Sequence, residues 1–181
     1  MESLDASFVV AVPIGDIRRD PDDASELVTQ ALMNTSALLG EVSGEWTHVI
    51  LSDYSGWIRT DELAEPIVRG YCSKDEGVCG VALPYSVVVT VAQTPLYASE
   101  TGDEMLAEVY LATALPYIDL AHPQRLRVAL AGNSEGWLVR DDVEVRSNAD
   151  LFPRQDIRVV TSYAKSLLGV PYLWGGTSCR G

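Results

Sequence analysis

The chain has 181 residues, of which 47% are hydrophobic, and its 26 acidic side chains outnumber 13 basic ones to give a formal net charge of -13. This length suits one large domain, or two small domains with a remainder. The negative charge repels phosphates, so we expect no nucleic-acid partner, and no apolar run reaches the ~18 residues of a membrane-spanning helix. The first residues, MESLDASFVVAVPIGD, lack the basic and apolar regions of a signal peptide. This favours a cytoplasmic protein, or a secreted or cell-envelope protein if the N-terminus is incomplete.

Short runs of β-forming residues separated by turn residues fill positions 1–145. The runs are FVVAVPI (8–14), WTHVIL (46–51), SGWIR (55–59), VVVTVAQ (87–93), LRVALA (126–131) and EGWLVR (135–140). Closely spaced short strands predict small barrels or sandwiches. Segment 22–32 leaves two alternatives open, a capped helical turn or an extended arm. Its first residues suit a helix cap, and its apolar residues have helix-compatible spacing.

One helix is predicted near the end of the chain, from about Asp156 to Leu168. Its apolar side chains recur at helical spacing: Val159, Val160, Tyr163, Ala164, Leu167 and Leu168. Gly169 followed by Pro171 is typical of the end of a helix.

An internal repeat organises the β-rich part of the chain. The segment WTHVILSDYSGWIRTDEL at 46–63 resembles LRVALAGNSEGWLVRDDV at 126–143, and their Gly-Trp pairs lie 80 positions apart. Each copy contains a strand, a polar turn, then Gly-Trp and a second strand with an acidic exit. The second copy has a turn one residue longer, so we expect its hairpin register to require a different turn or a bulge.

The cysteines and histidines do not form a metal-binding pattern. Cys72 and Cys79 are spaced C-x6-C, Cys179 is distant from them, and the only histidines are His48 and His122. We therefore expect no metal and no cofactor. Cys72 and Cys79 either close a small disulfide loop or remain free thiols. Both histidines are expected to have surface or structural roles.

The GEW hairpin at 44–46 and the Gly-Trp strands resemble bacterial SH3-like domains, which are small β-barrels. The segments IRRDP at 17–21 and SELVTQAL at 25–32 are similar to the SH3-like domains that precede NlpC/p60 catalytic domains. That resemblance implies that Glu26 and Met33 belong to a substrate-facing surface, although many relatives carry an aromatic residue in place of Met33. For Glu26 two interpretations remain open, a solvated carboxylate or a ligand for a substrate amine.

Segment 169–181, GVPYLWGGTSCRG, resembles the opening of the NlpC/p60 catalytic domain, whose pattern is G-x-P-Y-x-W-G-G followed by G-x-D-C-S-G. In that pattern the nucleophilic cysteine follows the Trp by about ten residues, whereas Cys179 follows Trp174 by five. The resemblance therefore places the nucleophile about three residues beyond Gly181 and the histidine base later still. We assign no catalytic residue within this chain. Trp174 is expected to form part of the cleft wall, and Tyr172 either shapes the cleft or packs in a core.

The expected fold is mainly β. Two tandem SH3-like barrels at 1–70 and 71–150 precede the first helix and loop of an α+β, papain-like NlpC/p60 domain at 151–181, which is incomplete.

The resemblance also implies a function. It suggests the front part of a hydrolase that cleaves the D-γ-glutamyl–diamino acid bond of peptidoglycan stem peptides by cysteine nucleophilic catalysis, with the SH3-like domains shaping specificity. The expected partner is a stem peptide of the L-Ala-γ-D-Glu-diamino acid type, and no oligomeric state is indicated. The alternative is a non-catalytic module of tandem SH3-like domains that binds cell-wall peptides.

Overall fold

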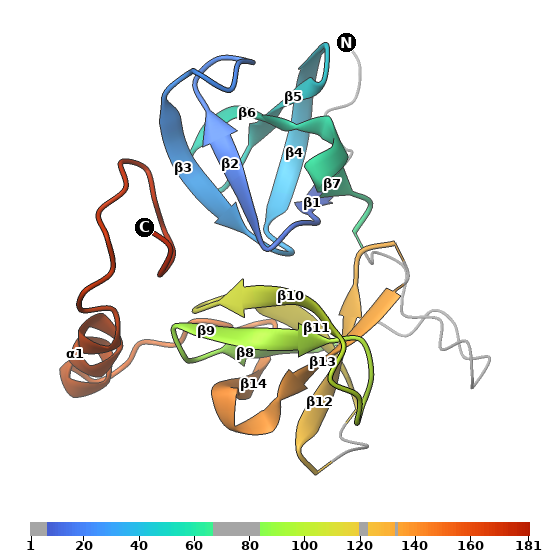
Figure 1. The fold of residues 1–181 in the computed structure, drawn as a ribbon, viewed down its shortest axis with the longest axis vertical. Helices are drawn as coiled ribbons and strands as arrows, with labels where there is room; N and C mark the ends of the chain where they lie inside the picture. Colours follow the sequence, from blue (N-terminus) through green and yellow to red (C-terminus); the bar gives the residue numbers. More distant parts are fainter. Residues whose placement is uncertain (1–6, 67–83, 120–122, 133) are drawn as a thin grey trace.

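The computed structural model of the protein describes residues 7–66, 84–119, 123–132 and 134–181. In these residues it contains two seven-stranded antiparallel sheets, followed by one α-helix and a C-terminal loop (Figure 1). The predicted mainly β fold is therefore confirmed. The predicted join between the barrels near residue 70, together with Cys72, Cys79 and His122, lies outside the described residues.

The first sheet is built from seven strands in the order β3-β2-β6-β5-β4-β1-β7. Its elements are β1 (Ser7–Val10), β2 (Ile14–Arg18), β3 (Leu27–Leu32), β4 (Ser36–Ser43), β5 (Trp46–Ile50), β6 (Ser55–Arg59), the 3-10 turn η1 (Thr60–Glu62) and β7 (Leu63–Ala64). Burial alternates along β2 and β6, as expected for strands with one face on a core. The buried core residues are Val10, Ile17, Ala31, Ala37, Val49 and Ile58.

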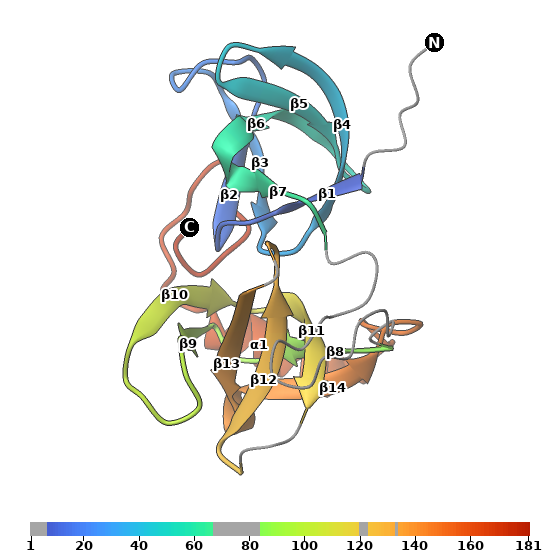
Figure 2. The same ribbon diagram turned by 90° about the vertical axis from the view of Figure 1, so that its right-hand side faces the viewer.

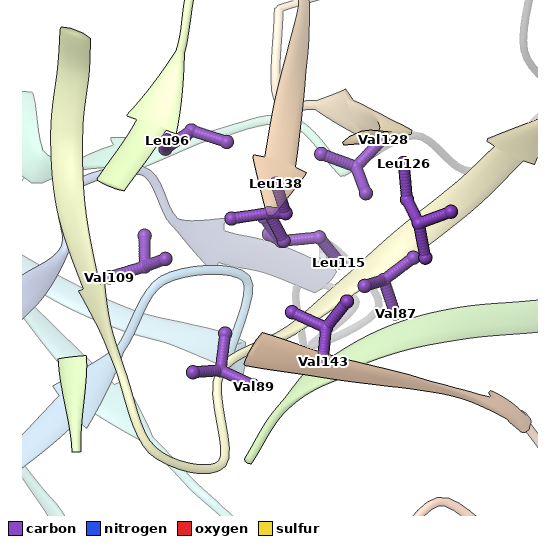
Figure 3. Close-up of a cluster of buried hydrophobic side chains, with 9 residues drawn as sticks. All are labelled: Val87, Val89, Leu96, Val109, Leu115, Leu126, Val128, Leu138 and Val143. Carbon is purple, nitrogen blue, oxygen red and sulfur yellow. The ribbon is translucent and has the colours of Figure 1, made fainter. Parts of the chain in front are cut away.

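The second sheet has the order β10-β9-β13-β12-β11-β8-β14, which repeats that of the first sheet strand for strand. Its elements are β8 (Tyr85–Val89), β9 (Gln93–Tyr97), β10 (Met105–Tyr110), β11 (Ala114–Asp119), β12 (Arg125–Leu130), β13 (Ser134–Val139), the 3-10 turn η2 (Arg140–Asp142) and β14 (Val143–Ser147). Its core side chains come from all seven strands, and Figure 3 shows them converging: Val87, Val89, Leu96, Val109, Leu115, Leu126, Val128, Leu138 and Val143.

The repeat extends to the register of the Gly-Trp hairpins. Gly56 lies opposite Val49 in the first sheet, and Gly136 lies opposite Val128 in the second. Six residues separate the first pair and seven the second, so the turn that was predicted to be one residue longer is confirmed. A Cβ atom at Gly56 would lie 2.6 Å from the Arg18 carbonyl oxygen, which explains why glycine occupies this position.

The segment predicted as either a helical turn or an extended arm is extended. Residues 20–25 form a turn in which the Asp22 carboxylate accepts the Ala24 N–H at 3.0 Å and the Ser25 hydroxyl accepts the Asp20 N–H at 2.9 Å. The residues after it form β3, which pairs with β2 and buries Thr29 and Ala31 on alternate positions. The helical alternative is therefore wrong, because pairing with β2 outweighs the local spacing of the apolar residues.

The two sheets contact each other through the turn between β3 and β4, and Figures 1 and 2 both show the first sheet above the second. The Asn34 side-chain amide donates to the Ala114 carbonyl at 2.9 Å. Met33 packs against the core of the second sheet, beside a cavity of about 110 Å³ that Leu115 and Leu130 also line. A flexible thioether suits this irregular gap between the two cores.

The predicted helix is present as α1 (Ile157–Ser166). The Asp156 carboxylate caps it by accepting the Arg158 N–H at 2.8 Å. Hydrogen bonds from the Arg158 guanidinium and then from this N–H hold the pKa of Asp156 below its usual value. No residue of α1 is buried, and Ile157 is 73% exposed. Its predicted apolar face therefore has no covering layer among the described residues. Among all the described residues, no helix is long and apolar enough to cross a membrane.

Candidate functional site

The C-terminal loop lies against β3 of the first sheet, as Figures 1 and 2 both show. The Trp174 indole N–H donates to Glu26 Oε1 at 3.0 Å, and the Arg19 guanidinium is 2.6 Å from the other oxygen, Oε2. Each carboxylate oxygen of Glu26 thus has one partner. Trp174 as a whole remains 61% exposed while its indole N–H is satisfied by Glu26.

Further along, the same loop hydrogen-bonds to Gln30 in the middle of β3. The Thr177 N–H donates to the Gln30 side-chain oxygen at 3.2 Å, and the Thr177 hydroxyl donates to the Gln30 main-chain carbonyl at 3.1 Å. Gly175 makes this close approach feasible, since its φ is +76° and a Cβ atom there would lie 2.6 Å from the Leu27 carbonyl oxygen. The Gly-Gly pair of the motif therefore serves to lay the loop on the strand.

Cys179 connects the end of the loop to the second sheet. Its thiol donates to the Gln93 side-chain oxygen at 3.3 Å, at the start of β9. Burial raises the pKa of the Cys179 thiol above its usual value, and the nearby Glu108 carboxylate acts in the same direction. A raised pKa reduces the thiolate fraction at neutral pH, which accords with the expectation that Cys179 is not the nucleophile.

A cavity of about 700 Å³ lies between the loop, the first sheet and the turn between β10 and β11. Its lining comprises Val28, Thr29, Gln30, Ala31, Leu32, Thr35, Leu51, Asp53, Tyr54, Leu111, Ala112, Leu167, Gly175, Gly176, Thr177, Ser178 and Cys179. Most of these groups are apolar side chains or backbone, and Asp53 is the one carboxylate among them. The cavity could therefore accommodate an extended peptide, to which its lining would offer few charged contacts.

Of the four residues predicted to bind substrate, the structure brings two together. Glu26 and Trp174 are hydrogen-bonded, although 148 positions separate them in the chain. Tyr172 lies in the same loop and is 85% exposed. Met33 follows the far end of β3 and faces the second core, so the strand separates it from Glu26.

Three polar residues at this site were not predicted from the sequence: Arg19, Gln30 and Gln93. Of these three, only Gln30 could have been found from the sequence. The alternation of a strand places its side chain on the face of β3 opposite to the buried Thr29 and Ala31. Among the described residues, no group of three or more His, Cys, Asp or Glu side chains could hold a metal ion. His48 packs edge-on against Trp57, with ring centroids 5.4 Å apart.

This chain is similar in sequence to a domain family and to a curated protein. Residues 17–63 match the family described as the bacterial dipeptidyl-peptidase Sh3 domain. A curated relative, gamma-D-glutamyl-L-lysine dipeptidyl-peptidase of Bacillus cereus, is 25% identical over 165 residues, covering 86% of this chain and 46% of the relative. The chain thus spans about half the length of this relative.

Two solved structures share the fold. An NlpC/P60 family protein from Bacillus cereus has a TM-score of 0.81 at 20% identity, covering 97% of this chain and 68% of that protein. An NlpC/P60 endopeptidase from Photobacterium damselae subsp. piscicida has a TM-score of 0.60 at 14% identity, covering 96% and 40% respectively. These likenesses show that this chain shares its fold with the two NlpC/P60 proteins, and residues 17–63 are similar to the bacterial dipeptidyl-peptidase Sh3 domain.

Proposed function

We propose that this chain is the substrate-recognition part of a cysteine peptidase that cleaves the D-γ-glutamyl–diamino acid bond of peptidoglycan stem peptides. The observation that carries the proposal is the hydrogen bond between Trp174 and Glu26, which joins the G-x-P-Y-x-W-G-G loop to the first sheet. The name of the curated relative, a gamma-D-glutamyl-L-lysine dipeptidyl-peptidase, supports the same class of bond.

In this proposal, Glu26 binds the free amine of an N-terminal L-Ala residue. Its carboxylate is already in contact with a cation, since Arg19 is 2.6 Å away, and the side chain of Arg19 is 64% exposed. An incoming ammonium group would replace this exposed guanidinium while Trp174 keeps the second carboxylate oxygen in place. Tyr172 and the exposed face of Trp174 would then pack along the peptide.

The domain assignment belongs to the same proposal. Residues 1–70 and 71–150 would be two SH3-like domains, and the identical strand order of the two sheets supports the second of them. Residues 151–181 would begin an NlpC/p60 catalytic domain. The nucleophilic thiolate and its base would come from the part of that domain that follows the G-x-P-Y-x-W-G-G pattern. A first sheet that closes one end of the cleft would favour free stem peptides with an unblocked amine over intact, cross-linked wall.

Binding of the tripeptide L-Ala-γ-D-Glu-diaminopimelate to the 181-residue chain tests the role of Glu26. We expect Glu26→Gln to weaken binding roughly tenfold, because it removes one charge-assisted contact. Arg19→Gln is the matched variant at the same ion pair, and it should strengthen binding a few-fold by removing the competing cation. The N-acetylated tripeptide is the control. If it binds as well as the free amine, the proposed amine site is wrong.

Hydrolysis separates the proposal from its alternative, a module of tandem SH3-like domains that binds wall peptides without cleaving them. The protein encoded by the complete gene should hydrolyse the tripeptide, and the 181-residue chain should only bind it. Hydrolysis by the 181-residue chain would contradict the assignment of the nucleophile. Binding without hydrolysis by the complete protein would favour the binding module.

A further inference from the structure

A series of hydrogen bonds links the face of the first sheet that points away from its core to the C-terminal loop. Arg18 donates to Asp16 Oδ2 at 2.9 Å, and Asp16 Oδ1 accepts the side-chain N–H of Gln30 at 3.1 Å. The Gln30 oxygen then accepts the Thr177 N–H at 3.2 Å. Because the amide nitrogen of Gln30 is engaged by a carboxylate, which can only accept, its oxygen is fixed in the direction of the loop.

The strand that carries Gln30 is suited to hold this loop. β3 is at the edge of the first sheet, so part of its backbone has no neighbouring strand among the described residues. The loop covers that edge, with the Thr177 hydroxyl on the Gln30 carbonyl and Gly175 close to the Leu27 carbonyl. A second glutamine, Gln93, holds the end of the loop from the second sheet and is itself fixed by donating to Glu108 at 3.3 Å.

We propose that Gln30 is a positioning residue: oriented by Asp16, it fixes the 175–179 loop on the edge of β3 and thereby sets where the segment after the loop begins. This inference rests on the proposed function, in which that segment leads to the nucleophile. Gln30 itself touches no reacting atom. Its contribution is to hold the loop in one place relative to Glu26, so that the amine of the peptide and the bond to be cleaved are held at a fixed separation.

The pairing of an acid with an amide offers a charge-swap test. Gln30→Glu keeps an acceptor for Thr177 but loses the donor to Asp16 and places two carboxylates in contact, so the loop should be released. In the double variant Asp16→Asn/Gln30→Glu, the new amide donates to Glu at position 30 and its oxygen still accepts from Arg18. The double variant thereby restores the hydrogen bonds between positions 18 and 16, 16 and 30, and 30 and 177. Gln155→Glu, on the exposed linker before α1, is the matched control for the added charge.

Alkylation of Cys179 reports whether the loop is docked, and we would measure it in the full 181-residue chain with Cys72 and Cys79 replaced by serine. Release of the loop exposes the Cys179 thiol and returns its raised pKa towards the usual value, and both changes accelerate alkylation. We expect roughly fivefold faster alkylation in Gln30→Glu, and rates equal to the parent in the double variant and in Gln155→Glu. Far-UV circular dichroism establishes that the sheets are intact in each variant, and Gln30→Met provides an uncharged variant should Gln30→Glu unfold.

Two results would overturn the inference: an unchanged alkylation rate in Gln30→Glu and Gln30→Met, or a double variant as reactive as Gln30→Glu. In the complete protein, Gln30→Glu should lower kcat more than it raises KM, and the double variant should recover kcat. If alkylation responds as expected but the complete protein hydrolyses no stem peptide, the positioning role of Gln30 holds for the loop and the proposed function fails.

Discussion

The first and second sheets have the same strand order, but they differ at the positions that meet the rest of the chain. In the first sheet, edge strand β3 carries Gln30, which binds the C-terminal loop. At the equivalent place in the second sheet, edge strand β10 carries Glu108, which accepts a hydrogen bond from Gln93 of its own neighbour β9. The two copies thus share a backbone pattern, while their edge side chains serve different contacts.

A second difference lies at the 3-10 turns that follow the Gly-Trp strands. In η2, the Asp142 carboxylate accepts the Thr94 hydroxyl at 2.6 Å. In η1, Glu62 occupies the equivalent place, and the strand position facing it is Gly15, which has no hydroxyl to offer. Burial raises the pKa of Glu62 to about 7, with the negative charges of Asp16 and Asp61 adding to the shift. The same backbone therefore holds a hydrogen-bonded acid in one copy and a poorly solvated one in the other.

The largest expected effect distinguishes the two Gly-Trp strands. A Cβ atom at Gly56 would lie 2.6 Å from the Arg18 carbonyl oxygen, whereas one at Gly136 would lie 2.6 Å from Cδ1 of Leu96. A backbone carbonyl cannot move without breaking the strand pairing, but the end of a leucine side chain can rotate. We therefore expect Gly56→Ala to lower the free energy of unfolding by ~2–3 kcal/mol and Gly136→Ala by ~1 kcal/mol. Denaturant unfolding of both variants measures the difference, and equal losses would contradict it.

Glu62 provides the next test, which depends on pH. Because its folded-state pKa of about 7 is above the ordinary value of 4.5, protonated Glu62 favours the folded state. That stability is fully present below pH 4.5 and is lost as the pH rises through 7. Glu62→Gln should therefore stabilise the protein by ~1 kcal/mol more at pH 8 than at pH 4. This difference is smaller than the free energy that corresponds to the whole pKa shift, because solvent screens the half-exposed carboxyl.

Charged groups around Glu62 also influence its pKa. The acids Asp16, Asp61 and Asp23 raise its pKa and Arg59 lowers it. Asp142→Asn is the matched control, and it should destabilise the protein at both pH values because it weakens the contact with the Thr94 hydroxyl. A gain from Glu62→Gln that is equal at pH 4 and pH 8 would show that Glu62 does not titrate in this range.

Features set by local sequence could be predicted, whereas contacts between residues far apart in the chain could not. The Gly-Trp hairpins and α1 follow local patterns, namely a turn followed by glycine and an apolar period of a helix, so they were predicted in the correct places. Glu26 and Trp174 were each assigned to the substrate-binding surface from the resemblance of two separate motifs to one family, but the hydrogen bond between them was not predicted. Gln30 and Gln93 were not predicted, because their roles arise only when the C-terminal loop, 147 and 86 residues away, lies against β3 and β9. Arg19 was not predicted either, because its contact with Glu26 depends on the turn that precedes β3. No local pattern encodes such a contact.

The turns before β4 and β11 give the smallest expected effect. Asn34 and Ala112 occupy equivalent positions, with φ of +68° and +72°, and their N–H groups donate to the equivalent carbonyls of Val10 and Val89. Asparagine tolerates this left-handed conformation, and its side chain also bonds Ala114 in the second sheet, whereas alanine is strained by ~1 kcal/mol or more. Ala112→Gly should relieve that strain, and after the entropy of an added glycine we expect a net gain of ~0.5 kcal/mol.

Asn34→Gly is the control for Ala112→Gly, and we expect it to change the stability of the protein in the opposite direction. It relieves little strain and removes the bond to Ala114, so we expect a loss of ~1 kcal/mol where Ala112→Gly gives a gain. Thermal unfolding of the two variants should therefore shift the melting temperature in opposite directions. If both variants are stabilised, the Asn34 side chain contributes nothing to holding the sheets together, and the contact between them must depend on the packing of Met33 against the second core.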